Sequence, residues 1–286
     1  MNSHRRGDLP AGRSPRRQSA DRRTEAETIV AVADLHGHRK HLDALLRHLD
    51  DKLGDSYQLV LLGDYVDNGP DIPGLLGRLL ELQAERDGRF TPILGNHDLA
   101  CLRVLGWPGK TPDPTWYQNW KHYWGWSGPD GSTSLAYGAH SAAELAERMP
   151  ASHVDFLRSL PWCFDTGRYF FVHCGLNKGP IAPQRDALET RALPAEHTYL
   201  PPAIRDKVLA IVTDDSWDRV VVSGHTAKPG NKVSRHPHAP HFMTAKRICL
   251  SAEIDSTGIL YAIVLPRREV VRVTPDLAVK VVTQVT

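Results

Sequence analysis

Five short polar motifs, each placed directly after an apolar run, constrain the fold of this chain more than any other feature of its sequence. Each motif combines glycine with aspartate, histidine or asparagine. The motifs lie at 34–37, 63–69, 95–98, 173–175 and 224–225. Short apolar runs bounded by such residues predict buried strands, and glycine lets the backbone turn sharply where a strand ends. The pattern therefore predicts a sheet whose strand ends collect polar side chains.

Amphipathic stretches separate the first three of these apolar runs. Strands are predicted at 28–33, 58–62 and 90–94, and leucines recur at helical spacing after residue 39 and over 75–86. Strands that alternate with helices predict an α/β fold, in which the active site lies at the carboxyl ends of the strands.

The chain is predicted to hold one folded domain, over 28–286, behind a disordered basic leader at 1–27. Residues 105–134, here called the Trp-rich segment, contain five of the seven tryptophans together with several prolines and glycines, and are predicted to be an inserted lobe. Further on, 175–201 is predicted to be a long loop and 248–273 a set of antiparallel strands.

The charges are unevenly distributed between leader and domain. The net charge is +2, yet residues 1–27 hold seven arginines against four acidic residues, which leaves 28 basic and 29 acidic residues in the domain. A slightly acidic domain argues against a nucleic-acid partner, and the leader lacks the apolar region of a secretory signal. No run approaches the roughly 20 apolar residues of a membrane helix. The four scattered cysteines favour a reducing, cytoplasmic location.

The residue types in the five motifs suit metal-dependent hydrolysis. Carboxylate oxygen, imidazole nitrogen and amide oxygen together suit Mn, Fe or Zn, whereas a thiolate site would need cysteine ligands. Asp64, at a strand end, is a candidate bridge between two cations about 4 Å apart, which would neutralise phosphate oxygens and lower the pKa of a bridging water. His97 is the candidate that would protonate a leaving group.

The series ADLHG, GDYVDNG, GNHD, VHCG and SGHT resembles the binuclear metallophosphoesterases. More narrowly, it is similar to the PPP-type Ser/Thr phosphatases and their bacterial relatives, which include the symmetrical diadenosine tetraphosphate hydrolases. The resemblance extends in order over residues 28–265. It implies a four-layer α/β/β/α sandwich and a centre of two metal ions, with Mn as the first expectation and Fe or Zn as alternatives.

Carried over by motif, the resemblance also implies a role for each site residue. The implied ligands are Asp34, His36 and Asp64 for one ion, and Asp64, Asn96, His173 and His225 for the other. His97 would be the general acid, and Asp67 would orient and charge its ring. The implied reaction is in-line attack of a metal-bridging hydroxide on a phosphoester, without a covalent intermediate.

The sequence departs from the family pattern at two positions. Asn68 stands where these phosphatases usually have an arginine that grips the substrate phosphate, and Asp98 stands where they usually have glutamate. A second phosphate-binding arginine is expected between the fourth and fifth motifs, with Arg191 as the first placement and Arg185 as the alternative. A basic cluster over 228–241 could also supply positive charge near the site.

The aromatic residues of the Trp-rich segment allow two interpretations. Trp116, Trp120, Tyr123 and Trp124 would form either an aromatic wall for an adenine or phosphoaryl group, or the packed face of a short helix. Their spacing favours the packed face, because apolar periodicity more often marks a core than a site.

Three functions are compatible with these observations. The leading one is a phosphatase acting on phosphomonoesters, with phosphoserine or phosphothreonine in proteins as the expected substrate and a small phosphoester as the other possible partner. The second is hydrolysis of a dinucleoside polyphosphate or another nucleotide at the same metals. The third is a catalytically inactive binding protein, which the complete set of motif residues disfavours. The sequence does not address the oligomeric state.

Overall fold

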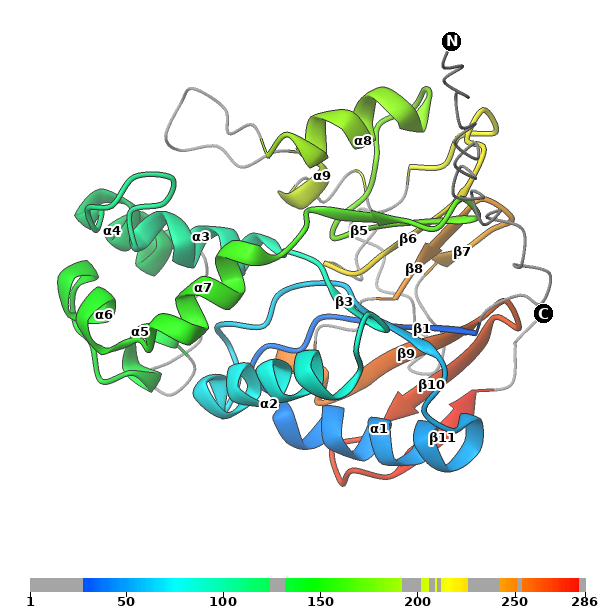
Figure 1. Cartoon of the computed structure of the whole chain (residues 1–286), viewed down its shortest axis with the longest axis horizontal. Helices are drawn as coiled ribbons and strands as arrows, with labels where there is room; N and C mark the ends of the chain where they lie inside the picture. Colours follow the sequence, from blue (N-terminus) through cyan, green and yellow to red (C-terminus); the bar gives the residue numbers. More distant parts are fainter. Residues whose placement is uncertain are drawn as a thin grey trace, which may run out of the picture.

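The computed structural model describes residues 28–123, 132–191, 202–205, 209, 212–225, 242–250 and 254–282. Two β-sheets face each other in these residues, in the strand orders β11-β10-β9-β1-β2-β3 and β4-β5-β6-β8-β7 (Figure 1). The strands are β1 Ile29–Val32, β2 Gln58–Leu61, β3 Phe90–Pro92, β4 Cys163–Asp165, β5 Tyr169–Val172, β6 Val220–Ser223, β7 Phe242–Met243, β8 Arg247–Cys249, β9 Leu260–Leu265, β10 Glu269–Val273 and β11 Val279–Val282. The helices are α1 Arg39–Leu53, α2 Ile72–Glu85, α3 Asn96–Val104, α4 Pro114–Tyr123, α5 Thr133–Ala136, α6 Ala142–Arg148, α7 Ala151–Ser159, α8 Ile181–Glu189, α9 Pro202–Arg205 and α10 Ile254–Thr257.

Strand β1 shows why the two sheets stack. All four of its residues are buried, and alternate residues belong to different apolar clusters. Val30 and Val32 pack with the helices, whereas Ile29 and Ala31 share a cluster with Phe171 of the other sheet. Because successive side chains of a strand point to opposite faces, a continuous apolar run fits a strand that is covered on both sides.

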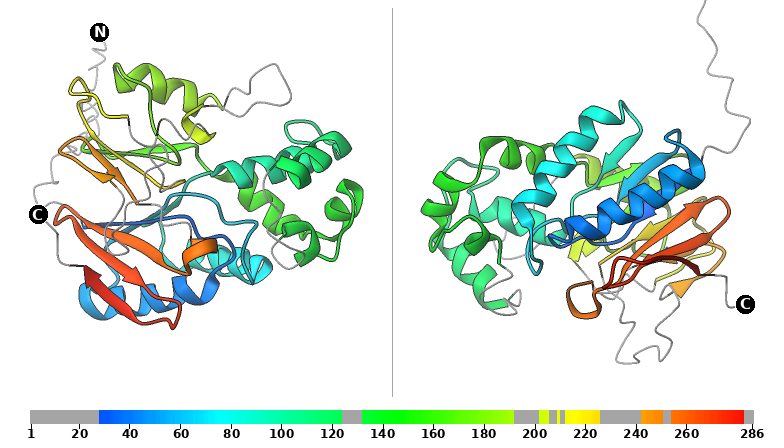
Figure 2. Two further views of the ribbon diagram at one scale, coloured as in Figure 1. Left: turned by 180° about the vertical axis from the view of Figure 1, so that it is seen from behind. Right: turned by 90° about the horizontal axis from the view of Figure 1, so that it is seen from below.

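Helices cover the outer face of each sheet. Helices α1 and α2 lie along the six-stranded sheet, and α8 lies over the five-stranded sheet, where Ile181 and Leu188 share a cluster with Phe170 and Val172. Figure 2 shows the same layers from behind and from below. The predicted four-layer α/β/β/α sandwich is therefore confirmed.

The topology brings the polar motifs to one edge of the sandwich. Strand β2 pairs in parallel with both β1 and β3, and β6 pairs in parallel with β5, so these five strands end in the five motifs. Parallel neighbours have their carboxyl ends at the same edge of a sheet. The motif residues of both sheets can therefore meet there.

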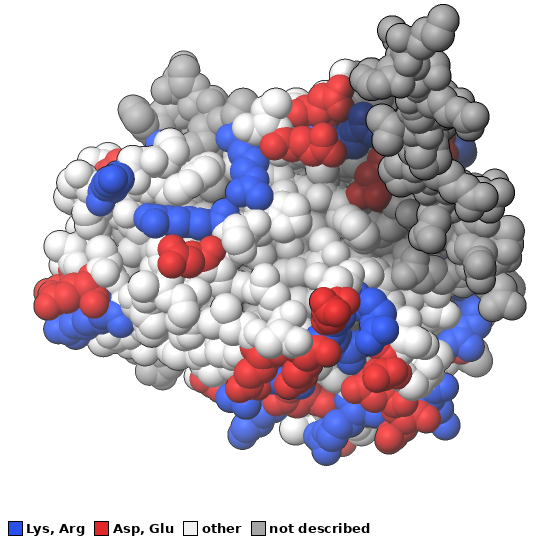
Figure 3. Space-filling view, viewed as in Figure 1, with Lys and Arg blue, Asp and Glu red and all other residues white. Residues whose placement is uncertain are grey.

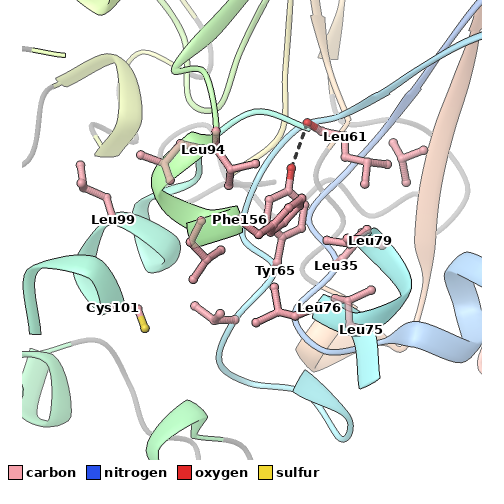
Figure 4. Packing of buried hydrophobic residues seen from close by; sticks show 14 of the residues in the cluster. Leu35, Leu61, Tyr65, Leu75, Leu76, Leu79, Leu94, Leu99, Cys101 and Phe156 are labelled. Atoms are coloured by element: carbon pink, nitrogen blue, oxygen red, sulfur yellow. Dashed lines mark hydrogen bonds between the residues drawn. The ribbon is translucent and has the colours of Figure 1, made fainter. Parts of the chain in front are cut away.

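A buried tyrosine anchors the longest of these motifs to the core. The Tyr65 side chain packs among leucines of α2 and near Phe156 of α7 (Figure 4). Its hydroxyl donates hydrogen bonds to Ile93 O at 2.8 Å and Leu61 O at 3.3 Å. Tyr65 therefore connects the loop after β2 to the carboxyl ends of strands β2 and β3.

The structure corrects two expectations about the second half of the chain. Residues 175–201 are not one long loop, because α8 occupies Ile181–Glu189 and packs its apolar side on the sheet. The run over 248–273 is not one antiparallel unit. Strand β8 pairs in parallel with β6 in one sheet, whereas β9 and β10 pair antiparallel in the other. Apolar composition alone does not indicate to which sheet a strand belongs.

The described part of the Trp-rich segment forms α4 and the beginning of α5, which lie with α3, α6 and α7 at one side of the sandwich. Its status as an insertion stays a prediction. Residues 1–27, Trp124, Trp126 and the basic cluster at 228–241 lie outside the described residues. Among the described helices, none combines the length and the apolar character needed to span a membrane.

Candidate metal centre

Residues of all five motifs converge at the carboxyl ends of the parallel strands. The described part of the chain contains two groups of possible metal ligands that share Asp64. Within each group, the ligand atoms lie within 4.8 Å of one another. One group is His36, Asp64 and His97, and the other is Asp64, His173 and His225. Asp64 thus occupies the shared position expected of a bridging carboxylate.

His173 is the centre of the second group. Its Nε2 lies 3.2 Å from Asp64 Oδ2, 2.8 Å from Asn96 Oδ1 and 3.1 Å from His225 Nδ1. Asp34 approaches from the end of β1, where its Oδ1 accepts from the backbone N–H of His225 at 2.9 Å and lies 4.0 Å from His173 Nδ1. The structure therefore brings Asp34 and Asn96 into the same cluster.

Backbone carbonyls fix the orientation of two imidazole rings. His36 Nδ1 donates to Val66 O at 2.9 Å, and His173 Nδ1 donates to Leu62 O at 2.6 Å. In both rings the other nitrogen, Nε2, is directed at Asp64. A hydrogen bond from one ring nitrogen to a carbonyl sets the tautomer and orientation of a histidine whose other nitrogen binds metal.

Several motif residues have left-handed backbone conformations. The φ angles are 38° at His36, 54° at Asp64, 65° at Asp67, 63° at Asn68 and 73° at His225. This region is uncommon for residues other than glycine, and such conformations cluster at functional sites where the surrounding structure holds them in place.

Two glycines allow the loops after β2 and β3 to approach closely. Gly63 has a φ of 100°, and a Cβ there would lie 2.7 Å from Gly95 Cα. A Cβ on Gly95 would lie 2.1 Å from Asp64 Oδ1, closer than any real contact. The glycines of the motifs are therefore required for Asp64 to occupy the shared position.

Asp98 links the same two loops. Its buried carboxylate accepts from the backbone N–H groups of Gly95, Asp64 and Tyr65, each at 2.9 Å. Burial and the charge of Asp64 raise the pKa of Asp98 to about 6, although the N–H donors act in the opposite direction. Asp98 therefore joins the loop after β2 to the start of α3.

The buried carboxylates and imidazoles shift one another's pKa values. Burial raises the pKa of Asp34. Burial would also raise the pKa of Asp64, but nearby His173 and His97 hold it well below its ordinary value. Burial acts to lower the pKa of His173, yet Asp64 and Asp34 raise it to about 9. Dense, compensating charges of this kind are typical of a functional site.

His97 lies beside this cluster and is paired with Asp67. Its Nδ1 is 2.9 Å from Asp67 Oδ2, and its ring meets the His36 ring edge to face at 4.9 Å. Burial acts to lower the pKa of His97, but the carboxylates of Asp64 and Asp67 raise it to about 9. These carboxylates therefore favour the protonated form of the ring, which a proton donor requires.

The arginines expected to bind substrate phosphate are held by other groups. Arg191 donates to the carbonyls of Arg158 and Ser159 at the end of α7, at 2.9 and 3.2 Å. Arg185 forms ion pairs with acidic groups that include Asp165. None of the described contacts joins either guanidinium to the cluster, so the substrate role of Arg191 stays a prediction. The role of Asn68 beside the site stays one too.

Sequence reasoning missed three buried residues that support the site. Trp120 and Thr133 donate hydrogen bonds to Asp67. Arg247 donates to Cys174 O at 3.0 Å and to Ser223 Oγ at 2.6 Å, which ties the loop of His173 to the loop of His225. No local pattern could have identified these contacts, because each joins residues 24 or more positions apart. A buried arginine in an apolar strand was the one unusual signal.

Comparison with known proteins agrees with this geometry. Residues 27–237 match the family described as Calcineurin-like phosphoesterase. A segment of 79 residues is 35% identical to Shewanella-like protein phosphatase 1 of Plasmodium berghei (strain Anka) and covers 24% of this chain and 22% of that protein. The chain thus matches about a fifth of the length of that relative.

A solved structure matches the fold with a TM-score above 0.5, and a second shows a weaker similarity. A candidate diadenosine tetraphosphatase has 23% sequence identity and a TM-score of 0.52, and the alignment covers 87% of this chain and 94% of that chain. A cold-active protein-tyrosine phosphatase of a psychrophilic Shewanella species has 16% identity and a TM-score of 0.45, with 90% and 80% covered.

The fold and the paired ligand groups define a metal-binding hydrolase with a two-sheet catalytic core. The family match covers most of the chain, and the chain belongs to the calcineurin-like metallophosphoesterases. The local match to a Shewanella-like protein phosphatase agrees with the narrower resemblance to PPP-type phosphatases.

Proposed function

We propose that this metallophosphoesterase hydrolyses phosphomonoesters, with phosphoserine and phosphothreonine in proteins as its substrate class. The observation that carries the proposal is the pair of ligand groups that share Asp64, with the His97–Asp67 pair directly beside them. This arrangement combines two cation sites with a proton donor, which are the components that phosphoester hydrolysis requires.

The donor set fits two divalent cations. Asp34, His36 and Asp64 would hold one, and the other would be held by Asp64, Asn96, His173 and His225. The orientation of the His36 and His173 rings supports this assignment. Nδ1 of each ring donates to a backbone carbonyl, so Nε2 is the nitrogen that would bind a cation. When bound, such cations neutralise phosphate oxygens and activate the attacking water. The oxygen and nitrogen donors suit Mn, with Fe or Zn as alternatives.

His97 would donate its proton to the leaving oxygen. Asp67 accepts from Nδ1, which leaves Nε2 as the nitrogen that can face a substrate. A paired carboxylate keeps the ring protonated and oriented until the ester bond breaks. Asn68, next to Asp67, would contribute a neutral hydrogen bond where a charged arginine is usual, so binding of the phosphate would depend mainly on the cations.

The surface over α1 and α2 is consistent with the proposal that the bound cations supply the positive charge for the substrate. Acidic and basic side chains are interspersed over α1 and α2 (Figure 3), where Arg78 pairs with Asp43, Glu81 and Glu85. Mixed surface charge of this kind does not attract an anion over a distance. The surface over α1 and α2 therefore gives no support to recognition of an anionic substrate away from the metal centre.

The fold similarity to a candidate diadenosine tetraphosphatase supports a second function. In that case the same residues would cleave a phosphoanhydride of a dinucleoside polyphosphate. His97 would then protonate a phosphate oxygen, which is a better leaving group and needs less assistance.

A substrate comparison on one preparation tests the proposal. The purified full chain with Mn is assayed on a phosphoserine peptide, a phosphothreonine peptide, 4-nitrophenyl phosphate and diadenosine tetraphosphate. We expect phosphopeptide hydrolysis with the highest kcat/KM, and its loss after removal of metal by a chelator. Preferred cleavage of diadenosine tetraphosphate would establish the second function. No hydrolysis of any of the four would indicate a binding protein instead.

A further inference from the structure

Asp67 is held by residues that come from outside the metal-ligand motifs. It is almost fully buried, and both of its carboxylate oxygens accept hydrogen bonds from the helical side of the molecule. A buried carboxylate needs such partners, because an unpaired charge is costly in a dry environment. The identity of the donors shows which part of the chain controls Asp67.

Trp120 of α4 binds the oxygen that faces His97. Its indole N–H donates to Asp67 Oδ2 at 2.7 Å, and the same Oδ2 lies 2.9 Å from His97 Nδ1. The Trp120 side chain is fully buried. The indole therefore fixes the position of the oxygen that orients the imidazole, and this contact gives Trp120 a role besides that of a packed aromatic residue.

Thr133 of α5 binds the other oxygen. Its hydroxyl donates to Asp67 Oδ1 at 2.6 Å and accepts from the backbone N–H of Asp67 at 3.0 Å, and its own N–H also donates to Oδ1 at 3.1 Å. Thr133 is fully buried as well. The contact holds both the carboxylate and the left-handed backbone of Asp67.

We propose that Trp120 and Thr133 are positioning residues that hold Asp67 so that His97 faces the leaving group. The inference rests on the proposed function, since it assigns the helices beside the sandwich a part in proton donation. These two residues lie 53 and 66 positions after Asp67, in α4 and α5, and their described side-chain hydrogen bonds go to Asp67 and not to Asp64 or His173. Metal binding should therefore be independent of them.

The test uses substrates that differ in their need for a proton. Phenyl phosphate has a poor leaving group and depends on a general acid, whereas 4-nitrophenyl phosphate has a good one and depends on it little. For Trp120→Phe, which keeps an aromatic ring and removes the N–H, we expect kcat on phenyl phosphate to fall about tenfold. On 4-nitrophenyl phosphate we expect less than about a twofold change, and KM for both should stay within about twofold.

Matched variants separate positioning from packing. Trp116→Phe changes a buried tryptophan one turn earlier on the same helix, where the ring faces Arg103, and should leave both rates unchanged. Thr133→Val removes the hydroxyl and should reproduce the selective loss, whereas Thr133→Ser retains the hydroxyl and should restore the rate on phenyl phosphate. Each variant is expected to hold as much metal as the wild type.

Proton NMR of the metal-free protein gives a readout that does not involve turnover. The His97 Nδ1 proton, assigned by its loss in His97→Asn, should shift in Trp120→Phe and not in Trp116→Phe. An equal loss on both substrates, a loss of metal, or unchanged rates in both Trp120→Phe and Thr133→Val would overturn the inference. If the wild type hydrolyses no phosphoester, the proposed function fails, and an unshifted Nδ1 proton would then overturn the positioning role separately.

Discussion

The metal-ligand cluster and the proton-donor pair lie side by side but are held in different ways. Most of the proposed ligands lie in the loops that follow strands, and backbone groups of neighbouring loops fix two of them, with Val66 O on His36 and Leu62 O on His173. The proton-donor pair of His97 and Asp67 is fixed by side chains of the helices, chiefly Trp120 and Thr133.

Because they are held differently, the metal-ligand cluster and the proton-donor pair should respond to different substitutions. Ligand positions set by the strands and their loops depend on the sandwich itself, so they should tolerate changes in the helices. The position of the acid depends on the packing of α4 and α5, so it can be altered while the metals remain bound. We therefore expect variants in the two parts to fail in different ways.

The largest effect is expected at the residue that both ligand groups share. Asp64→Ala removes the one carboxylate common to the two groups. We expect both cations to be lost and kcat/KM to fall by about a thousandfold or more. Elemental analysis and a phosphoester assay on the same sample measure the two losses together.

Asp43→Ala is the control, since Asp43 is a partly exposed aspartate of α1 that pairs with Arg39 and Arg78. It should hold two cations and keep its rate within about twofold, because surface ion pairs contribute little. If Asp64→Ala keeps both cations, Asp64 does not bridge them, and the metal-ligand cluster is not built around this residue.

A smaller effect is expected from the close approach of the loops. In Gly95→Ala the new methyl group would lie 2.1 Å from Asp64 Oδ1, so the loop must shift. We expect unfolding free energy to fall by about 2 kcal/mol or more, measured by urea denaturation. Gly77→Ala is the matched control, because nothing lies within 4 Å of a Cβ at this position of α2. It should gain up to about 1 kcal/mol. Equal stability of the two variants would show that the loops are looser than described.

The last effect concerns protons that compete with the cations. In the metal-free protein the carboxylates of Asp64 and Asp34 outweigh burial and raise the pKa of His173 to about 9. Below that pH the ring carries a proton that a cation must displace, so affinity should rise by about tenfold per pH unit between pH 7 and 9. Calorimetry in buffers of different ionisation enthalpy measures the released proton. A flat profile over this range would exclude His173 from the ligand set.

The sequence predicted that the motif residues would meet at one edge of the sheets, and the reason is physical. Asp34, Asp64 and His173 each follow a continuous apolar run, and parallel strands bring such positions together at one edge of the sheets. The same local logic did not assign β8 to its sheet or find α8, since both depend on tertiary packing that a local pattern does not encode.

The proton-donor half was only partly predictable. Asp67 and His97 lie in motifs, but the contacts of Asp67 with Trp120 and Thr133 span 53 and 66 residues. The spacing of the tryptophans predicted a packed face, and Trp116 and Trp120 are indeed buried in the core. That spacing carried no sign that one indole N–H would reach a carboxylate, because periodicity reports burial and not hydrogen bonding.

The metal content of His97→Asn distinguishes a proton donor from a metal ligand. His97 lies within reach of His36 and Asp64, so geometry alone would also allow it to be a ligand. We expect His97→Asn to bind two cations per chain, as the wild type does, while turnover of phenyl phosphate falls by about 10² to 10⁴. If the variant binds only one cation, His97 is a ligand, and the division between a metal cluster and a separate proton donor is wrong.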